Sequence, residues 1–151
     1  MNPKKPNQSL KAKKIHSIGV GGIGMSALAR YFYSQGSFIS GSDKEMSVLI
    51  TDLQNEGIKD IWTPHNKQSL EKIDPDYVIY STAVTDQNEE LAWAKKNKRN
   101  ILHRSDLLEI ATGSKKLISV SGTHGKTTTT AMISEILINN NLNPSVILGG
   151  I

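Results

Sequence analysis

The chain has no cysteine among its 151 residues, which excludes disulfide bonds and thiolate metal sites and leaves the redox compartment open. It also has no apolar run near the roughly 18 residues that a membrane-spanning helix needs. The first residues contain no apolar core of a secretory signal. We therefore expect no membrane insertion, and the cytoplasm is the default location.

Acidic residues are missing from one end of the chain. Residues 1–14 contain five lysines and no acid, so the formal net charge of +4 leaves about −1 for the rest. Pro3, Pro6 and the scarcity of apolar side chains predict a disordered basic tail over residues 1–14. Aromatic residues make up only 5% of the chain, and no basic stripe with interleaved aromatics occurs. We expect no nucleic-acid partner.

Apolar runs typical of strands alternate with helical patterns after the tail. The strands are predicted at 15–18, 37–42, 58–62, 77–80 and 100–103, and the helices at 25–32, 48–55, 66–72, 88–97 and 105–111. Ser105 is the expected N-cap of the last helix. This alternation predicts an α/β domain with a parallel sheet.

A glycine-rich loop follows the first predicted strand and opens the first helix. Gly19, Gly21 and Gly24 form a complete G-x-G-x-x-G pattern. In a Rossmann-like domain these glycines permit a tight turn, close approach of a pyrophosphate and helix–sheet packing. Asp43 ends the next strand, where such domains hold a ribose hydroxyl. The alternative is a strand–helix turn without a ligand.

A second loop joins the apolar run 117–120 to a helical pattern. Strand, glycine loop with Gly-Lys-Thr and helix form the build of a P-loop. Backbone N–H groups would surround phosphates, Lys126 would reach the β and γ phosphates, and the Thr127 hydroxyl would bind Mg²⁺. Val120 stands where the usual pattern has its first glycine. The candidate ATP-binding residues are Gly122, Thr123, His124, Gly125, Lys126, Thr127 and Thr128.

A polar, glycine-bearing segment at 112–116 separates the two patterns. We predict a Rossmann-like domain over residues 15–113 and the start of a P-loop ATPase domain over 114–151. The second part contains only an opening βαβ unit, with strands at 117–120 and 145–148. Because a P-loop fold needs more strands, we expect the chain to be the front of a longer protein.

Several other residues have predicted roles. Ser81 and Arg104 follow predicted strands, at the carboxyl edge where α/β sheets bind ligands, so both are candidate substrate contacts. The alternative for Arg104 is a surface ion pair. His16 is either a core residue or a ligand contact, and His65 is predicted at the surface. Trp62 is expected to be a packing residue.

Six segments resemble the Mur ligases of bacterial cell-wall synthesis, and the resemblance covers about 15–151. The shortened P-loop of that family accounts for Val120, and Thr-His-Gly-Lys around His124 is similar to the family's alanine-adding members. The segments that carry the resemblance are 16–29, 41–43, 81–84, 103–108, 122–128 and 149–150.

The resemblance implies three domains, of which this chain would hold the first and the start of the second. It implies an ATP-dependent ligase of peptidoglycan synthesis, with ATP, Mg²⁺, UDP-N-acetylmuramate and L-alanine as its small-molecule partners. Lys126 and Thr127 would act in catalysis, and the short chain alone is expected to be inactive. The implied UDP-sugar contacts are Gly19, Gly21, Gly22, Gly24, Asp43, Ser81 and Arg104.

Two other function classes stay open. The first loop with its acidic residue is also the fingerprint of NAD-dependent dehydrogenases. The Gly-Lys-Thr loop argues against that class, because a dehydrogenase has no use for a triphosphate site. A non-catalytic nucleotide-binding module is the other alternative.

Overall fold

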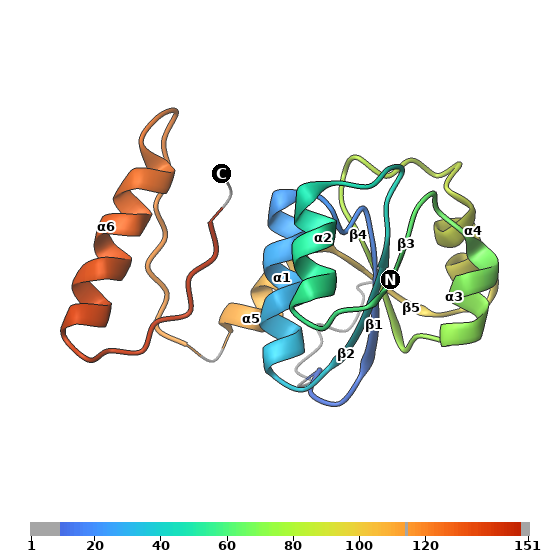
Figure 1. Cartoon of the computed structure of the whole chain (residues 1–151), viewed down its shortest axis with the longest axis horizontal. Coiled ribbons are helices and arrows are strands. Elements are labelled where there is room, and N and C mark those ends of the chain that lie inside the picture. Colours follow the sequence, from blue (N-terminus) through green and yellow to red (C-terminus); the bar gives the residue numbers. More distant parts are fainter. Residues whose placement is uncertain (1–9, 114, 149–151) are drawn as a thin grey trace, which may run out of the picture.

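A computed structural model describes residues 10–113 and 115–148. Five parallel strands form one sheet in the order β3-β2-β1-β4-β5 (Figure 1). The strands are β1 (Lys14–Ile18), β2 (Phe38–Ser42), β3 (Asp60–Trp62), β4 (Tyr77–Tyr80) and β5 (Asn100–His103). The predicted Rossmann-like α/β fold is confirmed.

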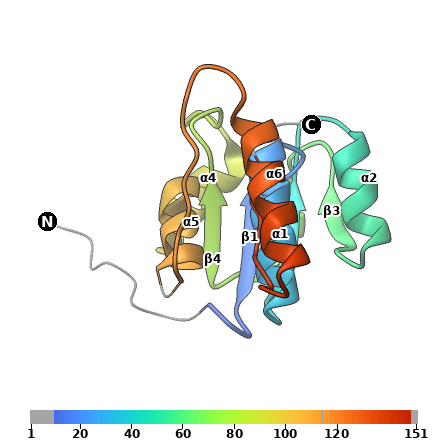
Figure 2. The same ribbon diagram turned by 90° about the vertical axis from the view of Figure 1, so that its left-hand side faces the viewer.

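Helices cover both faces of this sheet (Figure 1, Figure 2). One face carries α1 (Ile23–Ser34), α2 (Val48–Asn55) and α5 (Arg104–Thr112), and the other carries α3 (Lys67–Ile73) and α4 (Glu89–Lys96). The chain moves outward in opposite directions from β1 and β4. Ligands of open α/β sheets bind at such a switch point, beyond the carboxyl ends of the strands. None of the helices in the described ranges could cross a membrane.

The central strands are apolar on both faces because helices cover them on both sides. Ile15 and Ile79 face the α1 side, where they join the larger core cluster. Ile18 and Val78 face the α4 side. His16 also lies on the α4 side, one residue out of phase with Ile15 along β1. A polar side chain is thereby placed in the interior.

The structure corrects the predicted disorder at the end of the tail. Leu10 is 2% exposed and belongs to the main core cluster. Its carbonyl accepts a hydrogen bond from Ser37 Oγ at 2.8 Å, and Lys14 already belongs to β1. Residues 10–14 are therefore ordered, although residues 1–9 lie outside the described part. The order of this segment could not be predicted, because a single leucine among lysines forms no periodic apolar pattern.

We expect Leu10→Ala to lower the free energy of unfolding by about 2–3 kcal/mol, because it leaves a cavity in the core. Urea unfolding of the 151-residue chain measures this. Lys13→Ala, three residues along and exposed, is the control and should change stability by less than about 0.5 kcal/mol. Equal effects of the two substitutions would show that Leu10 does not dock.

The expected N-cap of α5 is also corrected. His103, not Ser105, caps the helix, and its ring nitrogen Nδ1 accepts the N–H of Ser105. Asp106 Oδ2 accepts the N–H of His103 at 2.9 Å and completes a capping box. Arg104 is thereby the first residue of α5, directly at the end of β5.

The predicted βαβ unit is confirmed only for its helix, α6 (Lys126–Asn139). Neither 117–120 nor 145–148 forms a strand, and no backbone hydrogen bond between described residues joins these two segments. A strand exists through its ladder with a neighbour, and here none is paired. Leu117 and Ile118 remain exposed.

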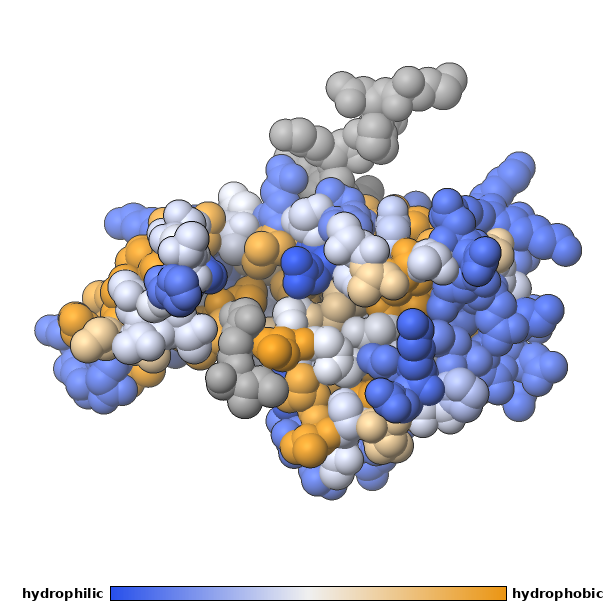
Figure 3. Space-filling model, turned by 90° about the horizontal axis from the view of Figure 1, so that it is seen from above, coloured by the Kyte–Doolittle hydropathy of each residue, from blue (hydrophilic) through white to orange (hydrophobic). Residues whose placement is uncertain are grey.

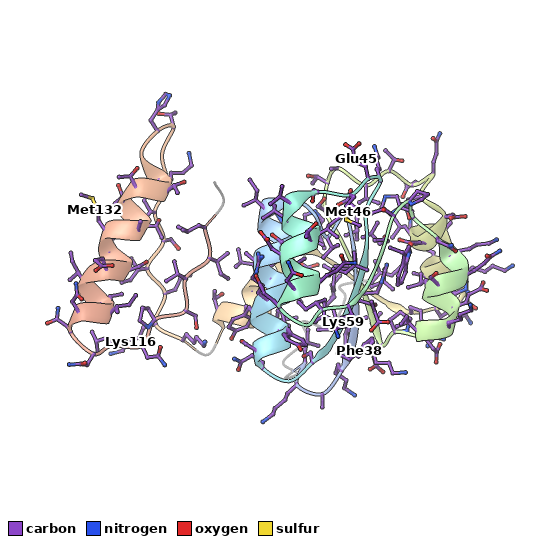
Figure 4. The ribbon with its side chains drawn as sticks, in the orientation of Figure 1. Phe38, Glu45, Met46, Lys59, Lys116 and Met132 are labelled. Carbon is purple, nitrogen blue, oxygen red and sulfur yellow. The ribbon has the colours of Figure 1, made fainter. Side chains whose placement is uncertain are left out.

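The unit around α6 stands beside the helical face formed by α1 and α5 (Figure 1). No residue of α6 is buried. Met132 points away from the rest of the molecule (Figure 4), and apolar side chains gather over this unit on the left of Figure 3. In the segment after α6, Ile147 packs against the main core cluster.

Candidate functional site

A pocket of about 670 Å³ opens at the carboxyl edge of the sheet, at the switch point between β1 and β4. Figure 3 views the molecule from this side, and Figure 4 marks the lining residue Glu45 on the loop between β2 and α2. The pocket lining includes all the residues proposed from sequence for the UDP-sugar. They are Gly19, Gly21, Gly22, Gly24, Asp43, Ser81 and Arg104.

The glycine loop turns tightly between β1 and α1. Gly19 has a φ of +79°, a left-handed conformation that favours glycine, and its carbonyl accepts the N–H of Gly22 at 3.2 Å. Gly22 is the N-cap of α1 and supplies no side chain to cap the helix. The N–H of Met25 donates to the Gly22 carbonyl at 3.0 Å, whereas the N–H groups of Ile23 and Gly24 have no backbone acceptor among the described residues. These two groups and the positive end of the helix dipole therefore stay available to an anion.

Asp43 braces this loop from β2. Its Oδ2 accepts the N–H of Gly21 at 2.8 Å, and its Oδ1 accepts the N–H of Lys44 at 2.7 Å. A Cβ on Gly21 would lie 2.9 Å from Asp43 Oδ2 and 3.0 Å from Ser47 Oγ. The close neighbours of Gly21 are thus protein atoms, whereas the sequence interpretation placed a pyrophosphate there. A ribose contact by Asp43 stays a prediction.

Arg104 lines the same pocket, beside Gly24 at the start of α1. Its Nη1 is 2.7 Å from the position that a Cβ of Gly24 would take, so the missing side chain makes room for the guanidinium. In the described residues no carboxylate lies within ion-pair distance of Arg104. A guanidinium next to a helix N-terminus suits a phosphate, which accepts charge-assisted hydrogen bonds from both.

A buried carboxylate stands behind the pocket. Glu90, in the first turn of α4, is 0% exposed. Its Oε1 accepts from Trp62 Nε1 at 2.9 Å and from the N–H of Asn66 at 2.8 Å, while its Oε2 accepts from Ser42 Oγ and lies 3.3 Å from His16 Nε2. Burial raises the pKa of this carboxyl, but the bonds and charge around it outweigh burial and lower the pKa to about 2.

The two histidines near Glu90 take different roles. His16 is 0% exposed and stacks on Trp62 with ring centroids 5.0 Å apart, which settles the open alternative in favour of a core residue. His65 was predicted at the surface, and this is wrong. Its side chain is 17% exposed and lines the pocket, with Nδ1 2.8 Å from Ser42 Oγ. Its position just after β3, at the carboxyl edge, was the available signal.

The second glycine loop lies outside this pocket. Gly125, with a φ of +77°, caps α6 without a side-chain hydrogen bond. Lys126 Nζ donates to the carbonyls of Gly122 at 2.5 Å and Thr123 at 3.2 Å, so the ammonium folds back over the loop. Thr127 follows in the first turn of the helix.

The described residues contain no group of three acidic or histidine side chains that could hold a metal by themselves. The Thr127 hydroxyl is nevertheless a hard oxygen donor of the kind that Mg²⁺ accepts beside substrate phosphates. Thr127 at the start of α6 could therefore serve as one protein ligand to Mg²⁺.

Comparison with known proteins places this geometry in a family. The model of the Mur ligase family, catalytic domain, matches residues 14–116. The UDP-N-acetylmuramate–L-alanine ligase of Dictyoglomus turgidum is 45% identical over 141 residues, which cover 93% of this chain and 30% of that protein. The enzyme of the same name from Clostridium acetobutylicum is 39% identical over 92% of this chain and 30% of its own.

Solved structures agree. The UDP-N-acetylmuramate–alanine ligase MurC of Thermotoga maritima superposes with a TM-score of 0.86 at 39% identity, covering 92% of this chain and 32% of that one. The UDP-N-acetylmuramate:L-alanyl-γ-D-glutamyl-meso-diaminopimelate ligase (MPL) of Neisseria meningitides gives a TM-score of 0.85 at 27% identity, covering 92% of this chain and 43% of that one. The chain spans about 30% of the length of the curated relatives it matches. By its matching family model and these relatives, the chain belongs to the Mur ligase family.

Proposed function

We propose that this chain is the N-terminal part of an ATP-dependent ligase that joins L-alanine to UDP-N-acetylmuramate in peptidoglycan synthesis. The observation that carries the proposal is the switch-point pocket, where the start of α1 and Arg104 offer positive charge to a pyrophosphate. The names of the relatives, which are UDP-N-acetylmuramate–L-alanine ligases, supply the substrates. A cytoplasmic location follows from those substrates.

The two loops would serve two domains. Residues 15–113 would hold the UDP-sugar, since they contain the whole sheet and its pocket. Residues 114–151 would begin the ATPase domain. In support, α6 buries none of its residues, and Met132, Ile136 and Ile138 remain exposed, as expected of a helix whose sheet is supplied elsewhere.

The reaction would proceed in two steps. The lactyl carboxylate of UDP-N-acetylmuramate attacks the γ-phosphorus of ATP, ADP leaves, and an acyl phosphate forms. The amine of L-alanine then attacks the acyl carbon, and phosphate leaves. Both steps need positioning and neutralisation of phosphate charge more than covalent help from the protein.

The residues of the second loop would supply that neutralisation. Lys126 would exchange its bonds to the carbonyls of Gly122 and Thr123 for bonds to phosphate oxygens, and the backbone N–H groups would hold the β and γ phosphates. Mg²⁺, held by the Thr127 hydroxyl, would supply further positive charge to the phosphates. His124 and Thr128 would line the same loop.

A phosphate-release assay on the complete ligase tests the proposal. Phosphate is expected only when ATP, Mg²⁺, UDP-N-acetylmuramate and L-alanine are all present. Phosphate release at the same rate without L-alanine would contradict the assignment, because the amine of L-alanine would then not be the nucleophile of the second step.

Arg104→Ala should weaken binding of UDP-N-acetylmuramate to the 151-residue chain by about 10- to 100-fold, the cost of losing a charge-assisted hydrogen bond. Arg104→Lys should recover part of the loss, because it restores the charge without the planar fork. Calorimetry measures both. Arg30→Ala is the control. Arg30 lies further along α1, and its Nε is 2.6 Å from Oε2 of Glu56, with which it forms an ion pair. Wild-type affinity in Arg104→Ala would remove Arg104 from the site.

A further inference from the structure

A chain of hydrogen bonds leads from the interior to the pocket. Ser42 ends β2, is 0% exposed, and bonds through its Oγ both to Glu90 Oε2 and to His65 Nδ1. His65 Nδ1 also lies 3.5 Å from Glu90 Oε2. The buried carboxylate thus reaches a pocket-lining ring through one hydroxyl group.

Counting donors and acceptors shows where the hydrogens lie between Glu90, Ser42 and His65. An ionised carboxylate only accepts, so the single hydroxyl hydrogen of Ser42 points to Glu90. The Ser42 oxygen can then only accept a hydrogen bond from His65, and the ionised Glu90 carboxylate can likewise only accept one. Nδ1 of His65 must therefore carry the ring hydrogen.

The other ring nitrogen of neutral His65 is then a bare acceptor. Within the described residues Nε2 of His65 has no hydrogen-bond partner, and the ring lines the pocket. An ionised phosphate offers only acceptor oxygens, so it would not pair with this nitrogen. A ligand group that donates, an N–H or O–H, would.

We propose that Glu90, acting through Ser42, is a positioning residue that fixes the Nδ1–H tautomer of His65, so that Nε2 accepts a hydrogen bond from the nucleoside of the bound sugar nucleotide. The ligand half of this inference rests on the proposed function. The donor is the uracil N3–H or a ribose hydroxyl, since the positive start of α1 and Arg104 form the phosphate end of the pocket. His65 would thereby select for the nucleoside.

Nitrogen-15 NMR of the 151-residue chain tests the tautomer directly. At neutral pH the wild type should show a protonated Nδ1 and a bare Nε2 at His65. Ser42→Ala should shift His65 toward the Nε2–H form, which free imidazole side chains favour in water. Ser40→Ala is the matched control: Ser40 is also buried but bonds to His16 Nδ1, at 3.0 Å, and its loss should leave His65 unchanged.

A wild-type spectrum with hydrogen on Nε2 would overturn the relay, and this measurement needs no variant to fold. Retention of the Nδ1–H form in folded Ser42→Ala would equally remove Ser42 from it.

Calorimetry with uridine nucleotides tests the ligand contact. The probes are UDP, 3-methyl-UDP, 2′-deoxy-UDP and 3′-deoxy-UDP, each analogue lacking one donor. One analogue should bind wild type about threefold to tenfold more weakly than UDP, the range of a single hydrogen bond. That difference should disappear in His65→Ala. Equal losses in both proteins would overturn the contact.

The proposed function is tested separately from the tautomer of His65. If the wild type does not bind UDP at all, the sugar-nucleotide assignment is wrong, whereas the tautomer result of the NMR experiment stands or falls by itself.

Discussion

Lys126→Ala is expected to remove nearly all L-alanine-dependent phosphate release from the complete ligase, a loss on the order of several kcal/mol of transition-state stabilisation. The ammonium folds back over the glycine loop that leads into α6, with Nζ 2.5 Å from the carbonyl of Gly122, and the N-cap Gly125 makes no side-chain hydrogen bond to the helix. In the reaction it would stabilise charge on the transferring phosphoryl group. Alanine cannot replace that charge.

Binding of UDP-N-acetylmuramate to the same variant should be unchanged, because the pocket between β1 and β4 contains no residue of this loop. Lys116→Ala is the matched control: it removes an exposed lysine at the other end of the same unit (Figure 4). Wild-type turnover by Lys126→Ala would show that this loop is not the catalytic ATP site. The 151-residue chain should release no phosphate, since it spans only about 30% of its relatives.

Glu90→Gln is expected to lower the free energy of unfolding at pH 7 by about 3 kcal/mol, the equivalent of a carboxyl pKa that falls from 4.5 to about 2 on folding. The amide would also present N–H groups to donors such as Ser42 or Trp62, leaving buried donors unpaired. Urea unfolding of the 151-residue chain measures the effect.

The same substitution should alter the pH dependence of stability. Because the folded pKa of Glu90 is the lower one, its stabilisation is complete above about pH 4.5 and is lost as the pH falls toward 2. Wild type and Glu90→Gln should therefore converge in acid. Glu89→Gln, in the same helical turn but exposed, is the control. Parallel curves for wild type and Glu90→Gln down to pH 2 would contradict the burial of an ionised carboxylate.

The sheet and both glycine loops could be predicted from sequence because their signals are local. An apolar run such as 77–80 reads as a buried strand, and Gly19 to Gly24 specify a turn without help from distant residues. The sheet edge then brings Asp43, Ser81 and Arg104 together, since parallel strands end on one side.

The residues that sequence reasoning missed depend on distant partners. Glu90 belongs to a Glu-Glu pair at a helix start, a pattern typical of solvent-exposed residues. Only the fold, in which α4 packs on β4 and β5, lets the Glu90 side chain reach its partners Ser42 and His16 on the neighbouring strands. His65 gains its role through Ser42 in the same way. Segment 117–120 has strand composition, but composition provides no pairing partner.

The central claim is that the pocket between β1 and β4 binds a UDP-sugar. Calorimetric titration of the 151-residue chain with UDP-N-acetylmuramate, and with NAD in parallel, tests this claim most directly. The account predicts that the sugar nucleotide binds at one site per chain, that binding weakens in Arg104→Ala, and that NAD does not bind. Binding of NAD without binding of UDP-N-acetylmuramate would contradict the account and place the pocket with the dinucleotide-binding dehydrogenases.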